Sequence, residues 1–182
     1  MINYDSFCKK TLFSKEEIEK GVLAVAQTIN NDYDGQEVVF VTVLNGAFMF
    51  AADLVKNIKL DCYMDFIQCS SYGSGTTSNG ELTIKKDLSL DVTDKHVIIV
   101  EDILDSGYTL KNLIEYLKLR NPKSVKTAVF MDKTARREHD IEADYCVVTL
   151  DKDEFVIGYG LDYAQKYRNL PFVGVLKEEI YN

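Results

Sequence analysis

The segment 97–110, VIIVEDILDSGYTL, constrains the fold of this chain more than any other part of the sequence. Its first four residues are β-branched and apolar, which is typical of a strand buried on both faces in the middle of a parallel sheet. Carboxylates follow at Glu101, Asp102 and Asp105. From Leu110 onward, apolar residues recur at i, i+3, i+4 and i+7, the spacing of a helix. The segment therefore predicts a strand, an acidic turn, a loop containing hydroxyls and glycine, and then a helix.

The loop that enters this predicted helix has the features of a phosphate-binding site. Such a loop directs unpaired backbone N–H groups at one spot, with the positive end of the helix dipole behind them. Gly107 allows the chain to approach closely, and the hydroxyls of Ser106 and Thr109 add donors. Just upstream, Glu101 and Asp102 can accept hydrogen bonds from sugar hydroxyls or hold a hydrated Mg²⁺. A sugar with a phosphate at one end and hydroxyls at the other would span the loop and these carboxylates. The predicted site also lies at the carboxyl end of a strand, where open α/β sheets bind ligands.

The same segment resembles the phosphoribosyl-pyrophosphate (PRPP) signature of the type I phosphoribosyltransferases, and among them the hypoxanthine-guanine enzymes. The resemblance rests on a hydrophobic run, an acid pair and Asp-Ser-Gly-x-Thr at fixed spacing. Two other interpretations of the acidic turn stay open from this segment alone: a solvated loop, and the acidic pocket of a flavodoxin-like signalling domain. The resemblance implies an α/β fold with a mostly parallel central sheet of about five strands, flanked by helices. It also implies a small hood formed by the terminal segments, mainly 150–182, within a single domain over 1–182.

For this segment the resemblance implies specific roles. Asp105 would be the general base of the reaction, and Glu101 and Asp102 would bind the ribose of PRPP and Mg²⁺. The residues implied to bind the 5′-phosphate are Asp105, Ser106, Gly107, Tyr108 and Thr109.

Composition and charge exclude several classes of protein. The 182 residues carry 29 acidic and 21 basic side chains, a net charge of −8, which argues against a protein that binds nucleic acid. The sequence has no run of 18 apolar residues and no signal-peptide core at its start, so we expect no membrane segment. The cysteines show neither metal-ligand spacing nor a secreted disulfide framework, which predicts a cytoplasmic protein; they are Cys8, Cys62, Cys69 and Cys146.

A second strand–loop–helix unit precedes the signature. Residues 37–44 (EVVFVTVL) predict another buried strand, and 48–58 predict a helix. On physical grounds alone the connection could be a plain turn. By resemblance it is the family's pyrophosphate loop, formed here by Leu44, Asn45 and Gly46, with a non-proline cis peptide bond. Asn45 stands where the family usually has a basic residue.

Between these units lies a segment rich in small polar residues. Residues 60–68 predict a strand, and nine of the twelve residues in 69–80 are Ser, Thr or Gly. A linker is one interpretation, but a strand resumes at 82–86, and a long loop inside a compact domain is usually a lid or binding loop. The resemblance implies the family's flexible catalytic loop, which closes over PRPP and excludes water. The lid residues implied are Ser70, Ser71, Tyr72 and Gly73.

A lysine at the end of a further strand is the candidate for purine recognition. Residues 124–131 (SVKTAVFM) predict that strand, and Lys133 follows it. In isolation, this lysine would be interpreted as a solvated charge at the end of a strand. The resemblance instead implies that its ammonium donates to the exocyclic oxygen of a 6-oxopurine. Residues 143–150 predict another strand, and the helix expected at 14–31, with a capping box, belongs to the scaffold.

The C-terminal part resembles the hood of the family. Phe155 would stack on the purine and Val156 would offer backbone groups to its edge. Asp162 would meet the purine and a second Mg²⁺, and Arg168 would bind pyrophosphate. Without the resemblance, Phe155 would be interpreted as an ordinary core residue. Residues 151–154 (DKDE) stand just before it, where the family often has a proline.

The function implied by the resemblance is purine salvage. The phosphoribosyl group of PRPP would pass, with Mg²⁺, to N9 of hypoxanthine or guanine, giving IMP or GMP and pyrophosphate. The expected partners are these small molecules and further copies of the chain in a homodimer or homotetramer. Two rivals are a PRPP-binding regulator, against which Asp105 and Lys133 argue, and a phosphotransferase or signalling domain. The chain lacks the G-x-x-x-x-G-K-[ST] motif that a P-loop phosphotransferase would need.

Overall fold

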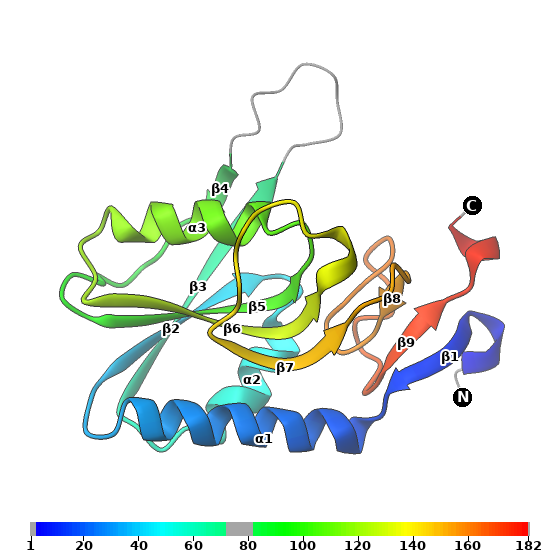
Figure 1. Ribbon diagram of the computed structural model, residues 1–182, viewed down its shortest axis with the longest axis horizontal. Helices are drawn as coiled ribbons and strands as arrows, with labels where there is room; N and C mark the ends of the chain where they lie inside the picture. The colour runs from blue at the N-terminus through cyan, green and yellow to red at the C-terminus, as the bar shows by residue number, and fades with distance from the viewer. Residues whose placement is uncertain (1–2, 72–81, 182) are drawn as a thin grey trace.

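The computed structural model describes residues 3–71 and 82–181, which form a large sheet covered by helices and a small sheet beside it (Figure 1). The strands are β1 (Cys8–Phe13), β2 (Val38–Leu44), β3 (Cys62–Ser71), β4 (Leu82–Lys86), β5 (His96–Leu104), β6 (Ser124–Lys133), β7 (Tyr145–Leu150), β8 (Val156–Ile157) and β9 (Val173–Leu176). The α-helices are α1 (Lys15–Asp32), α2 (Phe48–Val55) and α3 (Tyr108–Lys118).

The large sheet confirms the predicted, mostly parallel architecture. Its strand order is β4-β3-β2-β5-β6-β7, with β3, β2, β5, β6 and β7 parallel and the edge strand β4 antiparallel to β3. Along the chain, β3 is added on one side of β2 and β5 on the other. The direction of winding therefore reverses between β2 and β5. In open α/β sheets, ligands bind in the crevice at the carboxyl ends of the strands at such a point.

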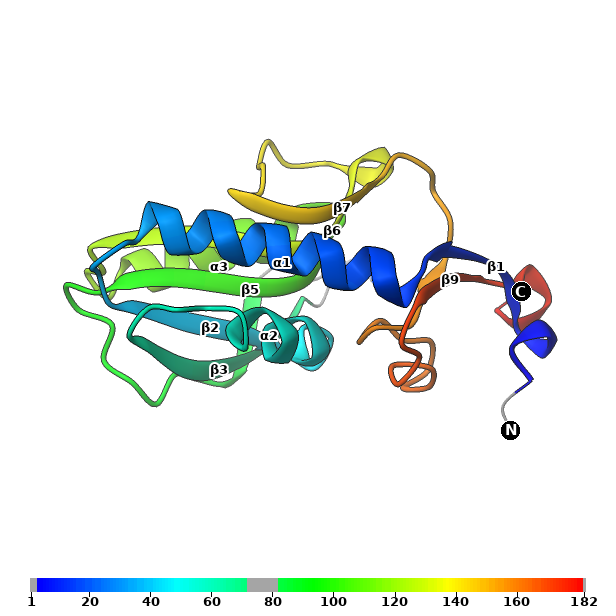
Figure 2. The same ribbon diagram turned by 90° about the horizontal axis from the view of Figure 1, so that it is seen from below.

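Helices cover both faces of this sheet, which explains why its central strands are apolar throughout (Figure 2). One core cluster joins α1 and α2 to the sheet, and a second joins α3 to the opposite face. Residues 97–100 of β5 are completely buried between these clusters. None of the helices in the described part of the chain is long and apolar enough to cross a membrane.

The first helix begins where its sequence predicts. The Ser14 Oγ atom accepts from the Glu17 amide at 3.3 Å, and the Glu17 carboxylate accepts from the Ser14 amide at 2.8 Å, which completes the capping box. Helix α2 is shorter than predicted, because it ends at Val55 instead of residue 58. Beyond this end, the Asn30 side chain of α1 donates to the Asn57 carbonyl at 3.0 Å and accepts from the Lys59 amide at 2.8 Å.

Three strands, β3, β5 and β6, extend further toward their carboxyl ends than predicted. Strand β5 continues to Leu104, so Glu101 and Asp102 lie in the strand and their assignment to a turn is wrong. Pairing with β6 holds this extension, because Glu101 lies opposite Val129. Similarly, residues 69–71 belong to β3, where they pair with β4. Strand β6 also continues to its last residue, 133, beside β7.

The small sheet forms the expected hood from both ends of the chain. Its order is β1-β9-β8, with all pairs antiparallel, and the two termini lie beside it in Figure 1. A separate cluster of Phe7, Ile157, Leu170 and Leu176 fills its interior. Strand β1 was not predicted, because three of its six residues are exposed and its sequence lacks a clear alternation. The hood therefore depends on pairing between residues that are far apart in the sequence.

A buried carboxylate connects β3 to the segment that leads into β5. The Asp65 oxygens accept hydrogen bonds from the amides of Phe66, Ser89 and Leu90 at 2.7, 2.7 and 2.8 Å. Burial alone would raise the pKa of Asp65, but these amides and Lys86 outweigh it and hold the pKa below its ordinary value of 3.8. The charged form is therefore part of the fold.

Replacing this carboxylate tests its contribution. Asp65→Asn should lower the free energy of unfolding at pH 7 by about 1–3 kcal/mol, because the amide NH₂ would face backbone donors. Since the pKa is lower in the folded state, the carboxylate contributes above its unfolded pKa, and the contribution is lost as the pH falls through its folded pKa. The free energies of unfolding of wild type and Asp65→Asn, measured with urea, should therefore differ at pH 7, and the difference should become smaller as the pH falls. The exposed Asp61→Asn is the control, and equal effects of the two variants would contradict the prediction.

Candidate active site

The loop between β5 and α3 forms a cradle at the carboxyl edge of the sheet. Gly107 has φ of +87° and caps α3, a conformation that glycine adopts without strain. A pocket of about 250 Å³ opens here. Of the predicted phosphate-binding residues, it is lined by Asp105, Ser106, Gly107 and Thr109. The Tyr108 side chain does not line this pocket, and its ring lies beside His139, with centroids 5.7 Å apart.

The acid pair is divided between two pockets. Successive residues of a strand point to opposite faces, so Glu101 lines the cradle while Asp102 lines a second pocket beneath the hood. Burial, together with the neighbouring charge of Asp102, raises the pKa of Glu101 well above its ordinary value. Its Oε2 atom is buried and has no hydrogen-bond partner among the described residues. Among the described residues, one buried oxygen of Glu101 is therefore left for a ligand to contact.

The predicted pyrophosphate loop lies against this acid pair. The Leu44–Asn45 peptide bond is cis, as the resemblance implied, and Asn45 is exposed. A side chain at Gly46 would overlap the Asp102 carboxylate, and a side chain at Gly160 would overlap the Gly46 carbonyl. The loop after β2 therefore packs directly on the Asp102 side chain, and the hood meets the backbone of this loop at Gly160, where only glycine fits.

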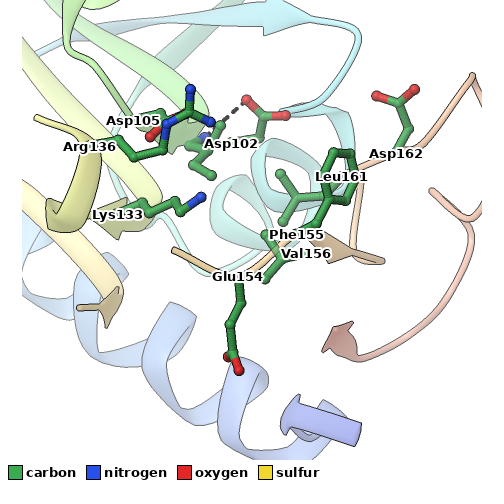
Figure 3. A pocket seen from close by; sticks show the side chains of 10 residues that line it. Asp102, Asp105, Lys133, Arg136, Glu154, Phe155, Val156, Leu161 and Asp162 are labelled. Atoms are coloured by element: carbon green, nitrogen blue, oxygen red, sulfur yellow. Dashed lines mark hydrogen bonds and ion pairs between the residues drawn. The ribbon is translucent and has the colours of Figure 1, made fainter. Parts of the chain in front are cut away.

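The second pocket, of about 220 Å³, lies between the end of the sheet and the hood (Figure 3). Of the predicted site residues, it is lined by Asp102, Asp105, Lys133, Phe155, Val156 and Asp162. Asp105 also lines the cradle, so it stands between the two pockets. Its Oδ1 atom is buried and has no partner among the described residues.

Lys133 is the last residue of β6 and lies inside the site. Its side chain is only 7% exposed, and Figure 3 shows its amino group directed into the pocket. The ammonium donates to the carboxylate of Asp153 at 2.6 Å, and this contact holds the pKa of Asp153 below its ordinary value. Interpretation of Lys133 as a solvated charge at the end of a strand is therefore wrong. An ammonium has three donors, so two remain for a ligand.

An aromatic ring forms the hood side of this pocket. Phe155 is 39% exposed, which excludes its interpretation as an ordinary core residue. Its ring stacks on Tyr181, with centroids 5.1 Å apart, and meets the edge of Tyr163 at 5.6 Å. The adjacent Val156 is buried and pairs with Val175 in the small sheet. The hood thus supports an aromatic ring that lines the pocket.

Asp162 and Arg168 form an ion pair at the edge of the site. An Arg168 Nη2 atom lies 2.7 Å from Asp162 Oδ1, and Nη1 donates to the Gly160 carbonyl at 2.6 Å. Asp162 also accepts from the Gln165 amide at 2.8 Å. Arg168 is therefore held beside the contact of Gly160 with Gly46, where the pyrophosphate loop lies.

The predicted lid falls only partly within the described residues. Ser70 and Ser71 end β3, two and three residues beyond Gln68, which lies opposite the last residue of β2. Tyr72 and Gly73 lie outside the described residues. Ser70 and Ser71 therefore project past β2 at the same edge of the sheet as the site.

Three charged side chains that contact predicted site residues were not identified from the sequence. Arg136, in the short 3₁₀-helix η2 (Thr134–Arg136), lies 3.7 Å from the Asp105 carboxylate. Arg137 bonds to the Asp105 carbonyl, and Asp153 binds Lys133. The basic pair Arg136–Arg137, which follows β6 after two residues, was a usable signal, because the carboxyl end of a parallel strand faces the site. Nothing local distinguishes Asp153 within the acidic run 151–154.

Comparison with known proteins places this geometry in a family. The model of the phosphoribosyl transferase domain matches residues 9–164. Hypoxanthine-guanine phosphoribosyltransferase from Streptococcus pneumoniae is 47% identical over 174 residues, covering 96% of each chain. The enzyme of that name from Bacillus subtilis is 44% identical over 173 residues, covering 95% of this chain and 96% of its own. The crystal structure of a hypoxanthine phosphoribosyltransferase from Staphylococcus aureus superposes with a TM-score of 0.93 at 42% identity, covering 98% of this chain and 96% of that one. On these matches over nearly its whole length, the chain belongs to the phosphoribosyl transferase domain family.

Proposed function

We propose that this protein is a hypoxanthine-guanine phosphoribosyltransferase of purine salvage. It transfers the phosphoribosyl group of PRPP to N9 of hypoxanthine or guanine and releases pyrophosphate, forming IMP or GMP. The named relatives above support this assignment through their similarity to nearly the whole chain. The observation that carries it is the position of Asp105, which lines both the phosphate cradle and the pocket beneath the hood.

The two pockets suit the two ends of the product nucleotide. The cradle offers amides at a helix start and the hydroxyls of Ser106 and Thr109 to the 5′-phosphate. The pocket beneath the hood offers the Phe155 ring and the Lys133 ammonium to the purine. The ribose then lies between them, where the bond from its anomeric carbon to pyrophosphate breaks as the bond to N9 forms. Asp105, at this point, accepts the proton from N7 of the purine.

The carboxylates of the acid pair suit a magnesium ion held together with substrate oxygens. Mg²⁺ is commonly bound by one or two carboxylates, with water and phosphate oxygens completing its octahedral coordination. Glu101 has a buried oxygen without a partner among the described residues, and Asp102 lies against the pyrophosphate loop. No cluster of three or more His, Cys, Asp or Glu side chains that could hold a metal occurs in those residues. We therefore assign Glu101 and Asp102 to Mg²⁺ and the ribose hydroxyls, and Asp162 to a second Mg²⁺.

At the other end of PRPP, we assign binding of the leaving pyrophosphate to the loop of Leu44, Asn45 and Gly46 and to Arg168. Asn45 supplies no charge, so main-chain groups and the Arg168 guanidinium carry this role. A Mg²⁺ ion held by Glu101 and Asp102 would supply further charge neutralisation for the pyrophosphate group.

The direct test is the reaction itself. The purified protein, incubated with PRPP, Mg²⁺ and hypoxanthine, should release pyrophosphate and form IMP, and guanine should give GMP. A protein that binds PRPP without turnover would be a regulator, and the proposed activity would then be wrong.

The role of Asp105 as the base predicts a loss of turnover. Asp105→Asn should lower kcat by about 10²–10⁴-fold, the usual contribution of a general base, while PRPP binding stays largely intact. Steady-state kinetics and PRPP titration measure the two effects. Asp34→Asn, an exposed change remote from the pockets, is the control. An Asp105→Asn variant that keeps most of its kcat would show that this carboxylate is not the base.

The role of the acid pair predicts a defect in PRPP and metal binding. A double variant, Glu101→Gln with Asp102→Asn, should raise the KM for PRPP and the Mg²⁺ concentration required, because both lose a charged oxygen ligand. Titration of the free enzyme with hypoxanthine should change little. An unchanged PRPP affinity in the double variant would refute the assignment.

The role of Lys133 predicts the choice of base. Its ammonium donates to the 6-oxo group of hypoxanthine in a charge-assisted hydrogen bond, typically worth about 1.5–3 kcal/mol. Against the 6-amino group of adenine, donor meets donor, and sites built on such a bond can reject the wrong partner by about 10⁴-fold. We expect kcat/KM for adenine to be very low in the wild type and the preference for 6-oxopurines to fall in Lys133→Met. If the variant keeps the same preference factor, Lys133 does not select the base.

A further inference from the structure

The segment 137–141 packs against the back of the phosphate cradle, and Arg137 makes most of its polar contacts. The Arg137 Nε atom donates to the Asp105 carbonyl at 2.9 Å, and Nη2 donates to the Leu104 carbonyl at 3.2 Å. The same guanidinium donates to the Ile141 carbonyl at 2.6 Å and forms an ion pair with Asp132. One largely buried side chain thus ties the end of β5 to β6 and to the following loop.

The next carbonyl of the cradle is held by the same segment. The Ser106 carbonyl accepts from the amides of Glu138 and His139, both at 3.0 Å. Gly107 packs against this segment as well, because a side chain there would lie 2.6 Å from the Ile141 Cγ2 atom. In Figure 1, the loop that contains the segment arches beside the start of α3. Three consecutive carbonyls, those of residues 104–106, therefore face segment 137–141.

This arrangement fixes the direction of the amides on the other side of the loop. In a planar trans peptide the N–H points opposite to the C=O, and the described peptide bonds of the chain are trans apart from Leu44–Asn45. The N–H groups of residues 105–107 therefore point away from segment 137–141. Those of Ser106 and Gly107 have no hydrogen-bond partner among the described residues, and both residues line the cradle. Successive amides that converge in this way form an anion site.

We infer that Arg137 is a positioning residue that holds the cradle in the conformation that binds the 5′-phosphate of the nucleotide. This inference rests on the proposed function, because it assigns that phosphate to the cradle. Arg137 lines neither pocket, and its charge is paired with Asp132, so it does not act as a direct phosphate ligand. It acts through the carbonyls of Leu104 and Asp105, which the Nε and Nη2 atoms of its planar guanidinium bind together.

Paired ligands that differ only in the phosphate test this role. Arg137→Lys keeps the charge and loses the fork, and Arg137→Gln loses both. In both variants the Kd for GMP should rise about 10- to 100-fold, the range expected for a lost charge-assisted hydrogen bond. The Kd for guanosine, which lacks the phosphate, should stay unchanged. Calorimetric titration of the wild type and the variants with both ligands gives the four comparisons.

Two further variants make the test specific. Arg120→Lys is the matched control, because Arg120 is also a partly buried arginine ion-paired to an aspartate, Asp87, but lies beyond the far end of α3. It should change neither affinity. Ile141→Ala removes the side chain behind Gly107 without changing a charge, and it should weaken GMP binding in the same selective way but less. This variant keeps the inference testable if both Arg137 variants unfold.

Each contrary result has a distinct meaning. A wild type that binds no GMP would overturn the proposed function, and this inference with it. If the wild type binds GMP and the Arg137 variants bind it equally well, only the positioning role is wrong. Loss confined to Arg137→Gln would show that the charge matters and not the fork. Equal losses for GMP and guanosine would show general damage to the fold, and either result would overturn the inference.

Discussion

The burial of β5 on both faces and along both edges is the constraint on which the rest of the site depends. The strand pairs with β2 on one side and with β6 on the other, while helices cover its two faces. A strand enclosed in this way can carry charged side chains only where the cover ends. Glu101 is the first residue of β5 with a carboxylate side chain, and Asp102 and Asp105 follow within four positions. The chemistry of the protein is therefore confined to one edge of the sheet.

At that edge, the cationic side chains are each compensated by an acidic neighbour. Lys133 contacts Asp153, Arg136 lies near Asp105, Arg137 binds Asp132 and Arg168 binds Asp162. Lys133 and Arg137 are largely buried, and an unpaired buried charge is costly, so their ion pairs offset that cost in the ligand-free protein. An incoming phosphate does not have to supply the only counter-charge. It competes with existing carboxylates, which makes binding depend on geometry as well as on charge.

The parts of the fold that were predictable are those that local sequence determines. The β-branched runs at 38–44 and 97–100 indicated buried strands, and the capping box at Ser14 indicated the start of α1. The ends of the strands were not predictable, because Ser70 and Glu101 suit strands poorly and are held there by pairing with neighbours. Strand β1 was missed for the same reason, since its partner β9 lies at the other end of the chain.

The site itself was predictable where its residues follow a strand directly. The cradle, the acid pair and Lys133 all belong to segments whose pattern stands out in the sequence. The contacts that orient these groups were not predictable, because they join residues that are distant in the chain. The Lys133–Asp153 bond spans 20 residues and the bond of Arg137 to the Asp105 carbonyl spans 32. No periodic or local signal records such pairs, so tertiary geometry is needed to find them.

The two arginines after β6 constrain Asp105 in different ways. Arg137 holds its backbone carbonyl, which fixes where the carboxylate can lie, whereas Arg136 approaches the carboxylate itself at 3.7 Å. The Arg136 side chain is 59% exposed, whereas that of Arg137 is only 18% exposed, so the more buried arginine is the one that fixes the backbone of Asp105.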